Sequence, residues 1–473
     1  MFLTTTLPYI NSHGHIGHAF EFVLADAIKL AHKHLLGKEV HLNVGLDEHG
    51  LKVWQAAQVK GVTVEEHVAE MTTHWETFCR EFQINYDSFY KTSSPEHHAK
   101  VQAVWNKLLA QDDIYKKTYS GKYCVGCEAF KAAKDLDILG GCKDHPTTKI
   151  QTVSEENYFF RLTKYVPHLS EWLANSPQFL LPASARPELV NLITDSGDIS
   201  ISRVRESCPW GVAVPGDDAQ VMYVWFDALL NYIFAAGYPD KSFESNWKEV
   251  VQLCGPDNLR FQAIIFQSFL AALGLPQTNT LLVHGTVVDE SGQKMSKSMG
   301  NGVDPMEQLG KYGIEAIRYY MLGGLNTYAT SSWSETDLVL TYNAQVANDW
   351  GNMISRVLHL IDLKGLTIEQ LQAGYDHDFA AQVLSHKKEA LLCWEAFDVR
   401  GAVSWTNQLV KMGNKYINDN KIWASDEYEN QLSNVYYLLF EAAQLYRPIM
   451  PGVYLTTMSA IKALKKTVLF IKL

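Results

Sequence analysis

Strand and helix patterns alternate in the first part of the chain. Residues 1–10 are rich in β-branched and aromatic side chains and predict a strand, and residues 19–37 have the apolar spacing of a helix that ends at Gly37. Residues 38–50 predict a second buried strand followed by a turn. This order predicts a parallel α/β sheet of the Rossmann-like kind, in which ligands lie beyond the carboxyl ends of the strands.

The pattern changes twice further along the chain. Between about residues 115 and 222, short pieces rich in Cys, Gly and Pro replace it, which indicates an insertion. Amphipathic helical segments dominate the last third, at 338–362, 377–394, 398–420 and 427–447. We therefore expect four parts: the first half of the parallel-sheet domain at 1–114, a connective insertion at 115–222, the second half of the sheet domain at 223–334, and a helical bundle at 335–473.

Composition narrows the class of protein. With 473 residues, 47% of them hydrophobic, the chain is long enough for several packed domains. The formal net charge of −11 argues against a generally basic nucleic-acid-coating protein, so any polyanion must meet local patches. The first residues have no basic segment before a long apolar run, and the other apolar stretches are too short for a bilayer. We expect a cytoplasmic protein that does not bind membranes.

Three histidines lie within six residues near the start of the chain, at positions 13, 15 and 18. Imidazoles are common metal ligands, but this spacing across Gly14 and Gly17 does not present one face, and no nearby Cys or carboxylate completes a site. A turn without chemistry is a second reading. The third is a phosphate cradle, because a strand-to-helix turn aims backbone N–H groups and the helix dipole at an anion.

A second segment favours the phosphate reading. The stretch GQKMSKSMGN at 292–301 places Lys294 and Lys297 three residues apart in a glycine-flanked loop. Two ammonium groups on such a loop can close over a triphosphate while it is being cleaved.

With both segments in view, the chain resembles the class I aminoacyl-tRNA synthetases, whose two signatures are matched without substitution by residues 15–18 (HIGH) and 294–298 (KMSKS). The resemblance implies that His15, His18, Lys294 and Lys297 are catalytic and that Mg²⁺ accompanies ATP. It also implies an ATP-binding set made of His15, Gly17, His18, Gly255, Asp257, Lys294 and Lys297. His13 lies outside the signature and has no assigned role.

Longer matches narrow the resemblance to methionyl-tRNA synthetases. They include LPYIN at 7–11, DEHG at 47–50, SISRV at 200–204, VMYVWFDALLNYI at 221–233 and VHGTV at 283–287. The resemblance implies a methionine pocket made of Leu7, Tyr9, Asp47, Trp225, Tyr232 and Gln262. Aromatic rings suit the polarizable methionine sulfur, and Asp47 is expected to pair with the substrate ammonium.

The sequence departs from that family around the pocket. Gln262 stands where the family usually has His, Phe266 and Gln267 where it often has Trp-Pro, and Leu46 where Thr is common. Pro256 replaces the usual Lys beside Asp257. These changes bear on selectivity for methionine over its analogues.

Cysteines predict a metal site in the insertion. Cys124 and Cys127 form one x₂ knuckle and Cys142 and His145 another, and these four N/S ligands fit one structural, tetrahedral zinc ion. A disulfide would leave one of these three thiols unpaired.

The helical region carries a candidate RNA-binding face. Asn348, Asn352 and Arg356 recur every fourth residue, opposite an apolar stripe. This spacing resembles the anticodon-reading helix of methionyl enzymes, and Trp423 matches their base-stacking tryptophan. Amide, guanidinium and aromatic groups are what single-stranded RNA loops require.

These resemblances imply methionine–tRNA ligase activity used in protein synthesis: ATP, L-methionine and tRNA(Met) yield methionyl-tRNA through a methionyl-adenylate. A monomer is expected because no OB-fold module follows the helices. Three alternatives stay open: a cysteinyl-type class I enzyme, a non-catalytic RNA-binding relative, and a small nucleotidylyltransferase that shares HxGH. The cysteinyl enzyme would need a zinc thiolate at the pocket, the relative would have lost a signature, and the nucleotidylyltransferase would lack the knuckle and the helical domain.

Overall fold

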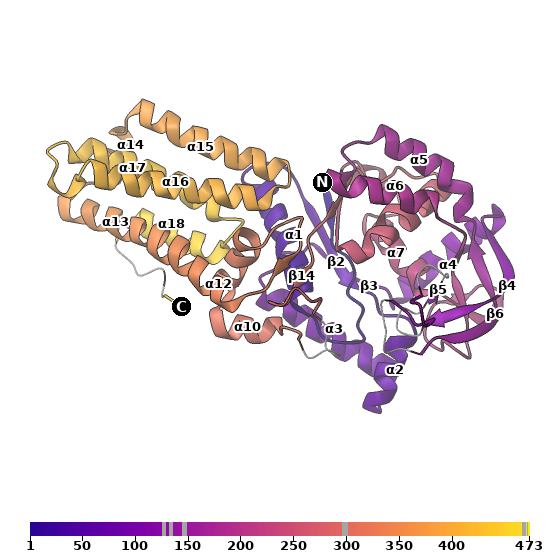
Figure 1. Cartoon of the computed structure of the whole chain (residues 1–473). Helices are drawn as coiled ribbons and strands as arrows, with labels where there is room; N and C mark the ends of the chain where they lie inside the picture. Colours follow the sequence, from indigo (N-terminus) through magenta and orange to yellow (C-terminus); the bar gives the residue numbers. More distant parts are fainter. Residues whose placement is uncertain (125–128, 132–135, 144–148, 296–300, 466–469, 471) are drawn as a thin grey trace.

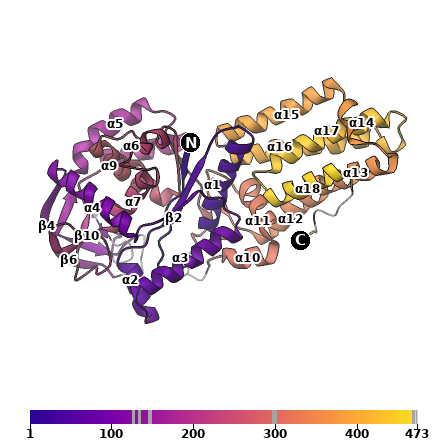
Figure 2. The same cartoon turned by 180° about the vertical axis from the view of Figure 1, so that it is seen from behind.

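A helical bundle and an α/β domain lie side by side along the molecule, and the insertion lies at the end far from the bundle (Figures 1 and 2). The computed structural model describes residues 1–473 except 125–128, 132–135, 144–148, 296–300, 466–469 and 471. The parallel-sheet domain and the helical carboxyl-terminal region that the sequence predicts are confirmed.

The central sheet has six strands in the order β3-β2-β1-β12-β13-β7, and each neighbouring pair is parallel. Its strands are β1 (Phe2–Thr4), β2 (His41–Leu46), β3 (Ser88–Lys91), β7 (Leu180–Leu181), β12 (Val250–Cys254) and β13 (Thr280–Val283). The strands that follow β1 in the chain lie on both sides of it, β2 and β3 on one side and β12 and β13 on the other. Parallel sheets bind ligands at such a switch point, here beyond the carboxyl ends of β1 and β12.

Alternation along β1 assigns its side chains to two cores. Leu3 packs in one core with α1 (Ile16–His34), α3 (Val64–Glu81) and the bundle, whereas Phe2 packs in the other with α4 (Pro95–Ala110), α7 (Val224–Ala235) and α9 (Phe266–Leu273). Successive strand side chains point to opposite faces, so both faces of the sheet are covered. The remaining helices of this domain are α2 (Leu51–Lys60) and α8 (Ser242–Asn246), with a π-helical segment η5 (Phe261–Ile265) ahead of α9.

The insertion is built on antiparallel strands. One sheet has the order β5-β4-β6-β8 and a smaller one β10-β11-β9. Their bounds are β4 (Ile114–Cys124), β5 (Ala129–Lys131), β6 (Gln151–Phe160), β8 (Ile199–Ser200), β9 (Ser202–Val204), β10 (Ala213–Val214) and β11 (Asp217–Met222). Helices α5 (Val166–Asn175) and α6 (Arg186–Thr194) also lie here, together with β7. The stretch predicted as insertion therefore supplies the edge strand of the central sheet.

Helices form almost all of the rest. After β14 (Val287–Val288) come α10 (Pro305–Tyr312), α11 (Ile314–Tyr319), η7 (Tyr320–Gly324), β15 (Ser331–Ser332), α12 (Glu335–Thr341), η8 (Tyr342–Gly351), α13 (Asn352–Lys364), α14 (Ile368–Ala373), α15 (His377–Glu395), α16 (Val399–Asp419), α17 (Tyr428–Tyr446) and α18 (Pro451–Ala463). Helices α14 and α18 lie outside the four helical segments that the sequence predicts by position. No helix among the described residues is both long and apolar enough to cross a membrane.

A buried guanidinium ties the α/β domain to the bundle. Arg318 on α11 donates to the carboxylate of Asp26 on α1 at 2.7 Å, and both side chains are fully buried. The same guanidinium also donates to the backbone carbonyls of Phe82, Pro448 and Ile449. One side chain therefore joins three segments that are far apart in the sequence.

Candidate active site

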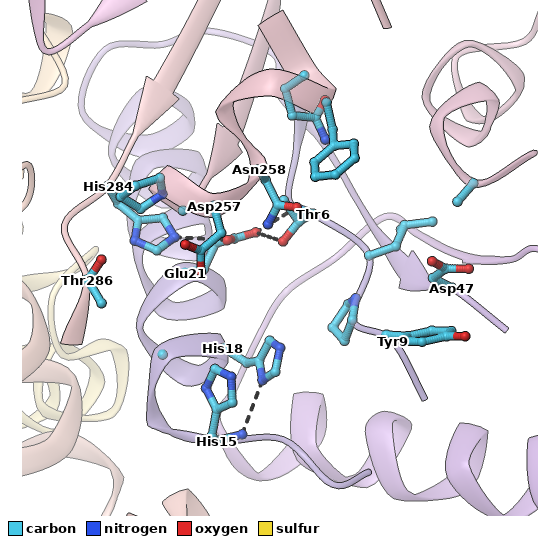
Figure 3. A pocket seen from close by; sticks show the side chains of 18 of the residues that line it. Thr6, Tyr9, His15, His18, Glu21, Asp47, Asp257, Asn258, His284 and Thr286 are labelled. Carbon is cyan, nitrogen blue, oxygen red and sulfur yellow. Dashed lines mark hydrogen bonds and ion pairs between the residues drawn. The ribbon is translucent and has the colours of Figure 1, made fainter. Parts of the chain in front are cut away.

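The main pocket is a cavity of about 420 Å³ beyond the carboxyl ends of the central strands. It is lined by Asp47, by Lys52 and by residues from six segments: 6–9, 15–21, 224–232, 255–262, 284–287 and 294–295. Figure 3 shows the two ends of this space, with His15 and His18 near one and Tyr9 and Asp47 near the other. Residues from both predicted subsites therefore line one cavity.

The HIGH segment forms the first turn of α1. His15 is the N-cap residue, its backbone N–H donates to Nδ1 of His18 at 3.2 Å, and the two rings stack with centroids 3.8 Å apart. A Cβ atom at Gly17 would lie 3.1 Å from the His15 ring, so glycine lets that ring lie over the turn. The rings of His18 and Trp75 pack in a T-shaped arrangement with their centroids 5.3 Å apart. Both imidazoles therefore stand at a helix N-terminus, where anions are favoured.

A buried carboxylate that the sequence analysis did not single out lies one turn further along α1. Glu21 accepts from the backbone N–H and the hydroxyl of Thr6 at 2.6 and 2.7 Å, and from Nε2 of His284 at 2.9 Å. Figure 3 shows the contacts of this carboxylate with Thr6 and His284. The only sequence signal was the VHGTV stretch that contains His284, which was matched to the family without a role.

The opposite wall carries the other predicted ATP-binding residues. Gly255 follows β12, and Asp257 lies in the 3₁₀ turn that comes next. The ammonium of Lys294 pairs with the carboxylate of Asp257, and both side chains are exposed at the pocket mouth. Lys297 falls outside the described residues, so its predicted role stays a prediction.

Tyr9 and Asp47 lie next to each other at the other end of the pocket. They form an isolated parallel bridge just beyond β1 and β2, and Leu7 lines the same wall. Gly50 has φ of +100°, and a Cβ atom there would lie 2.3 Å from the Tyr9 hydroxyl. The DEHG turn therefore needs glycine both for its backbone conformation and for the close approach of Tyr9.

Helix α7 supplies the aromatic wall. Trp225 packs against Phe261 at 4.3 Å between ring centroids, and Tyr232 is 2% exposed. Nε2 of Gln262 donates to the Tyr232 hydroxyl at 2.6 Å, and both residues line the pocket. Burial raises the pKa of Tyr232, which keeps its hydroxyl protonated at neutral pH.

Gln262 belongs to a chain of buried amides. Nε2 of Gln252 donates to Oε1 of Gln262 at 3.2 Å, Thr278 donates its hydroxyl to Gln252 at 2.7 Å, and Gln267 donates to Thr278 at 3.0 Å. Two of the residues that depart from the family pattern, at 262 and 267, are thus members of one hydrogen-bonded network. Each buried amide has a partner, as stability requires.

The predicted zinc ligands are described only in part. Cys124 is the last residue of β4, and the backbone of Cys142 forms an isolated antiparallel β-bridge with Leu136. Both cysteine side chains are fully buried. Cys127 and His145 lie outside the described residues. Among the described residues, no three His, Cys, Asp or Glu side chains form a group that could hold a metal. Two buried thiols suit zinc chemically, and the site stays a prediction.

Of the predicted anticodon residues, Arg356 and Trp423 lie beside each other in the bundle. Asn348 and Asn352 are exposed, Arg356 donates to Oδ1 of Asn418 at 2.8 Å, and its guanidinium lies 5.7 Å from the Trp423 ring centroid. Trp423 is 49% exposed, which is unusual for so large an apolar side chain. On the other face, five apolar residues are fully buried, as the pattern predicted: Val346, Trp350, Met353, Val357 and Ile361.

The family profile, the sequence relatives and the solved structure that match this chain are all tRNA synthetases. The family profile described as tRNA synthetases class I (M) matches residues 1–151 and 142–358. A methionine–tRNA ligase of Caldanaerobacter subterraneus subsp. tengcongensis is 37% identical over 467 residues, which cover 95% of this chain and 72% of the relative. That of a Nostoc species is 33% identical over 95% of this chain and 88% of its own length. The solved structure of Mycobacterium tuberculosis methionyl-tRNA synthetase in complex with methionyl-adenylate superposes with a TM-score of 0.89 at 29% identity, covering 97% of this chain and 92% of that one.

Proposed function

Because the chain belongs to the class I tRNA synthetases specific for methionine, we propose a role for each wall of its main pocket. The enzyme is a methionine–tRNA ligase: it joins methionine to ATP as methionyl-adenylate with release of diphosphate, and then passes the methionyl group to tRNA. One observation carries the assignment of roles, namely that a single cavity joins the histidine turn to the Tyr9–Asp47 corner.

The histidine end holds the phosphates. His15 and His18 donate hydrogen bonds to phosphate oxygens as the α-phosphate becomes five-coordinate, and the α1 N-terminus adds its dipole. Lys294 and Lys297 close over the diphosphate that leaves. Gly255 and Asp257 receive the ribose, with Glu21 and His284 fixing the wall beside it. Magnesium enters with ATP as part of the substrate.

The other end holds methionine. The Asp47 carboxylate pairs with the α-ammonium, and the side chain enters among Leu7, Tyr9, Trp225, Tyr232 and Gln262, with Gln262 also holding the Tyr232 hydroxyl. This places the substrate carboxylate toward the α-phosphate for in-line attack. Since no side chain forms a covalent bond, catalysis consists of positioning and charge stabilisation.

Two further assignments rest on the sequence resemblance and are supported by exposure or burial, and a third rests on the sequence alone. Asn348, Asn352, Arg356 and Trp423 bind the tRNA anticodon, since an exposed ring beside a guanidinium is a stacking platform. Cys124, Cys127, Cys142 and His145 hold one structural zinc ion that stabilises the insertion. The enzyme acts as a cytoplasmic monomer, with the four parts at 1–114, 115–222, 223–334 and 335–473.

Diphosphate–ATP exchange with each of the twenty amino acids tests this proposal. We expect exchange with methionine, and its reduction by Asp47→Asn through a higher KM for methionine. Exchange with a different amino acid would overturn the pocket assignment, and exchange with none would overturn the enzymatic role. Aminoacylation of tRNA(Met) with purified protein then tests the second step, and gel filtration tests the monomer.

A further inference from the structure

A cluster of buried ionisable side chains lies behind the methionine end of the pocket. Asp227 on α7 and His49 in the 47–50 turn are 0% and 1% exposed, and Nδ1 of His49 lies 2.6 Å from Oδ2 of Asp227. Nε2 of His97, on α4, lies 3.7 Å from the same carboxylate oxygen. None of these side chains lines the cavity, and the mechanism above uses none of them.

The cluster continues outward through two more contacts. Nε2 of His98 lies 3.1 Å from Nε2 of His49, and Nδ1 of His97 lies 3.1 Å from the Tyr90 hydroxyl. The histidines thereby connect β3, α4, the 47–50 turn and α7. Among the described residues, the second oxygen of Asp227 has no hydrogen-bond partner, so the imidazoles supply the polar contacts of this carboxylate.

Asp227 stays ionised in this environment. Burial by itself would raise the pKa of Asp227, but the His49 and His97 imidazoles outweigh burial and hold it below the ordinary value. A buried carboxylate that accepts from an imidazole N–H forms a short, charge-assisted hydrogen bond. The bond between His49 and Asp227 therefore links the turn to α7 through a short, charge-assisted contact.

The positions of the two residues in the chain connect this bond to the substrate. His49 lies two residues after Asp47, and Asp227 lies two residues after Trp225 and just before Ala228. Asp47, Trp225 and Ala228 all line the cavity. The bond thus spans the back of the pocket, between the residue that pairs with the ammonium and the aromatic wall that receives the thioether.

Other contacts hold the turn in the remaining directions. Glu48 accepts from Thr72 and Ser93 at 3.1 and 2.8 Å, and the Trp210 indole donates to the backbone carbonyl of Glu48 at 2.6 Å. These contacts reach α3, the end of β3 and the insertion, but none of them reaches α7. The bond to Asp227 joins the turn to the aromatic wall.

We propose that His49 and Asp227 are positioning residues that set the separation between Asp47 and the Trp225–Tyr232 wall, and through it the affinity for methionine. The inference rests on the proposed methionine subsite. Because the nucleotide end lies on other elements, the bond affects methionine binding and leaves ATP binding largely unchanged. Positional errors of about 1 Å at a substrate site are enough to change a rate or an affinity substantially.

Substitutions at His49 separate a positioning role from simple loss of stability. His49→Leu removes the donor, whereas His49→Asn keeps an N–H near the place of Nδ1. In diphosphate–ATP exchange, we expect His49→Leu and Asp227→Asn to raise the methionine KM tenfold or more, with the ATP KM within twofold of wild type. His49→Asn is expected to stay within about threefold of wild type for methionine.

Asp26→Asn is the matched control, because it also neutralises a fully buried carboxylate in an ion pair, but at the interface with the bundle. It is expected to lower the melting temperature and leave the methionine KM unchanged. Equal methionine KM values for wild type, His49→Leu and Asp227→Asn would overturn the inference, as would equal shifts in both KM values. If His49→Leu does not fold, Asp227→Asn and His49→Asn give the same comparison. Exchange by the wild type with another amino acid would instead overturn the methionine subsite, which separates the two failures.

Discussion

Lys294 and Asp257 form an ion pair across the mouth of the active-site cavity, one from the KMSKS segment and the other from the turn after β12. Both side chains are mostly exposed, so the pair contributes little to stability, about 0–1 kcal/mol. Each partner is proposed to contact ATP, one at the phosphates and one at the ribose. The pair must therefore open when ATP binds, and the small energy involved makes that opening easy.

Lys294→Ala should lower the rate of diphosphate–ATP exchange by roughly 10²–10³, the usual loss when one charge-stabilising donor is removed. The melting temperature should stay unchanged, because the pair is exposed. Lys311→Ala is the control, since Lys311 also pairs with a carboxylate, that of Glu335, away from the cavity. An exchange rate of Lys294→Ala equal to that of Lys311→Ala would contradict the phosphate role.

Gln262→Leu should weaken both the fold and methionine binding. It removes the donor to the Tyr232 hydroxyl and leaves Gln252 without its acceptor, which costs about 1–3 kcal/mol for each buried group left unpaired. Urea unfolding should show this loss, and the methionine KM in exchange should rise. Gln262→His, which restores a ring N–H donor, should recover part of the affinity. If Gln262→Leu binds methionine as the wild type does, Tyr232 does not depend on this support.

Stability should rise with pH between about 4 and 6.5 through His98. Burial and the neighbouring His49 lower the pKa of His98 to about 4, so in this interval the unfolded chain binds a proton that the folded protein does not. Protonation thus favours unfolding as the pH falls. Melting temperatures measured from pH 4.5 to 7 should change less steeply for His98→Gln, which keeps a donor toward His49. Parallel curves for the two proteins would exclude His98 as the source.

Arg356→Ala and Trp423→Ala should raise the KM for tRNA in aminoacylation and leave diphosphate–ATP exchange unchanged. Loss of a stacking platform costs about 1–3 kcal/mol per base, so an increase of roughly tenfold or more is expected for Trp423→Ala. Arg447→Ala removes an Arg–Tyr contact elsewhere in the helical region and serves as control. A tRNA KM that matches this control would move the anticodon site to another face.

Cys124→Ser should abolish zinc binding. Mass spectrometry under native conditions should find one zinc ion per wild-type chain and none in the variant, because a serine hydroxyl is a poor substitute for a thiolate ligand. Cys393→Ser, outside the insertion, should keep the ion. Wild-type protein without zinc after expression in zinc-containing medium would contradict the predicted zinc site.

Periodicity in the sequence was enough for two of the six strands of the central sheet, for the helix between them and for the long helices of the last third. Strands at the start and after Gly37 and the long helices of the last third all follow from local apolar spacing. The short edge strand β7 could not be found in this way, because two residues carry no period and its pairing with β13 joins segments about a hundred residues apart.

The active-site residues also divide into those that a local motif identifies and those whose role depends on partners distant in the sequence. The two motifs identified His15, His18 and Lys294, and all three line the cavity. Glu21 was missed because an acidic residue inside an amphipathic helix is normally solvent-exposed, and only the contacts of Thr6 and His284 explain its burial. The role of Gln262 was also partly missed, since its partners Gln252 and Thr278 come from distant strands and loops.

Arg318 has a consequence for how this enzyme unfolds. A guanidinium that satisfies Asp26, Phe82 and the 448–449 turn makes the α/β domain and the bundle share one buried charge. Loss of the bundle would leave buried guanidinium N–H groups without their carbonyl acceptors, which costs about 1–3 kcal/mol for each group left unpaired, a large part of the stability of an ordinary domain. The bundle and the α/β domain should therefore unfold together as one cooperative unit. A chain cut near residue 335 would lose the 448–449 carbonyls, which accept hydrogen bonds from the buried Arg318 side chain.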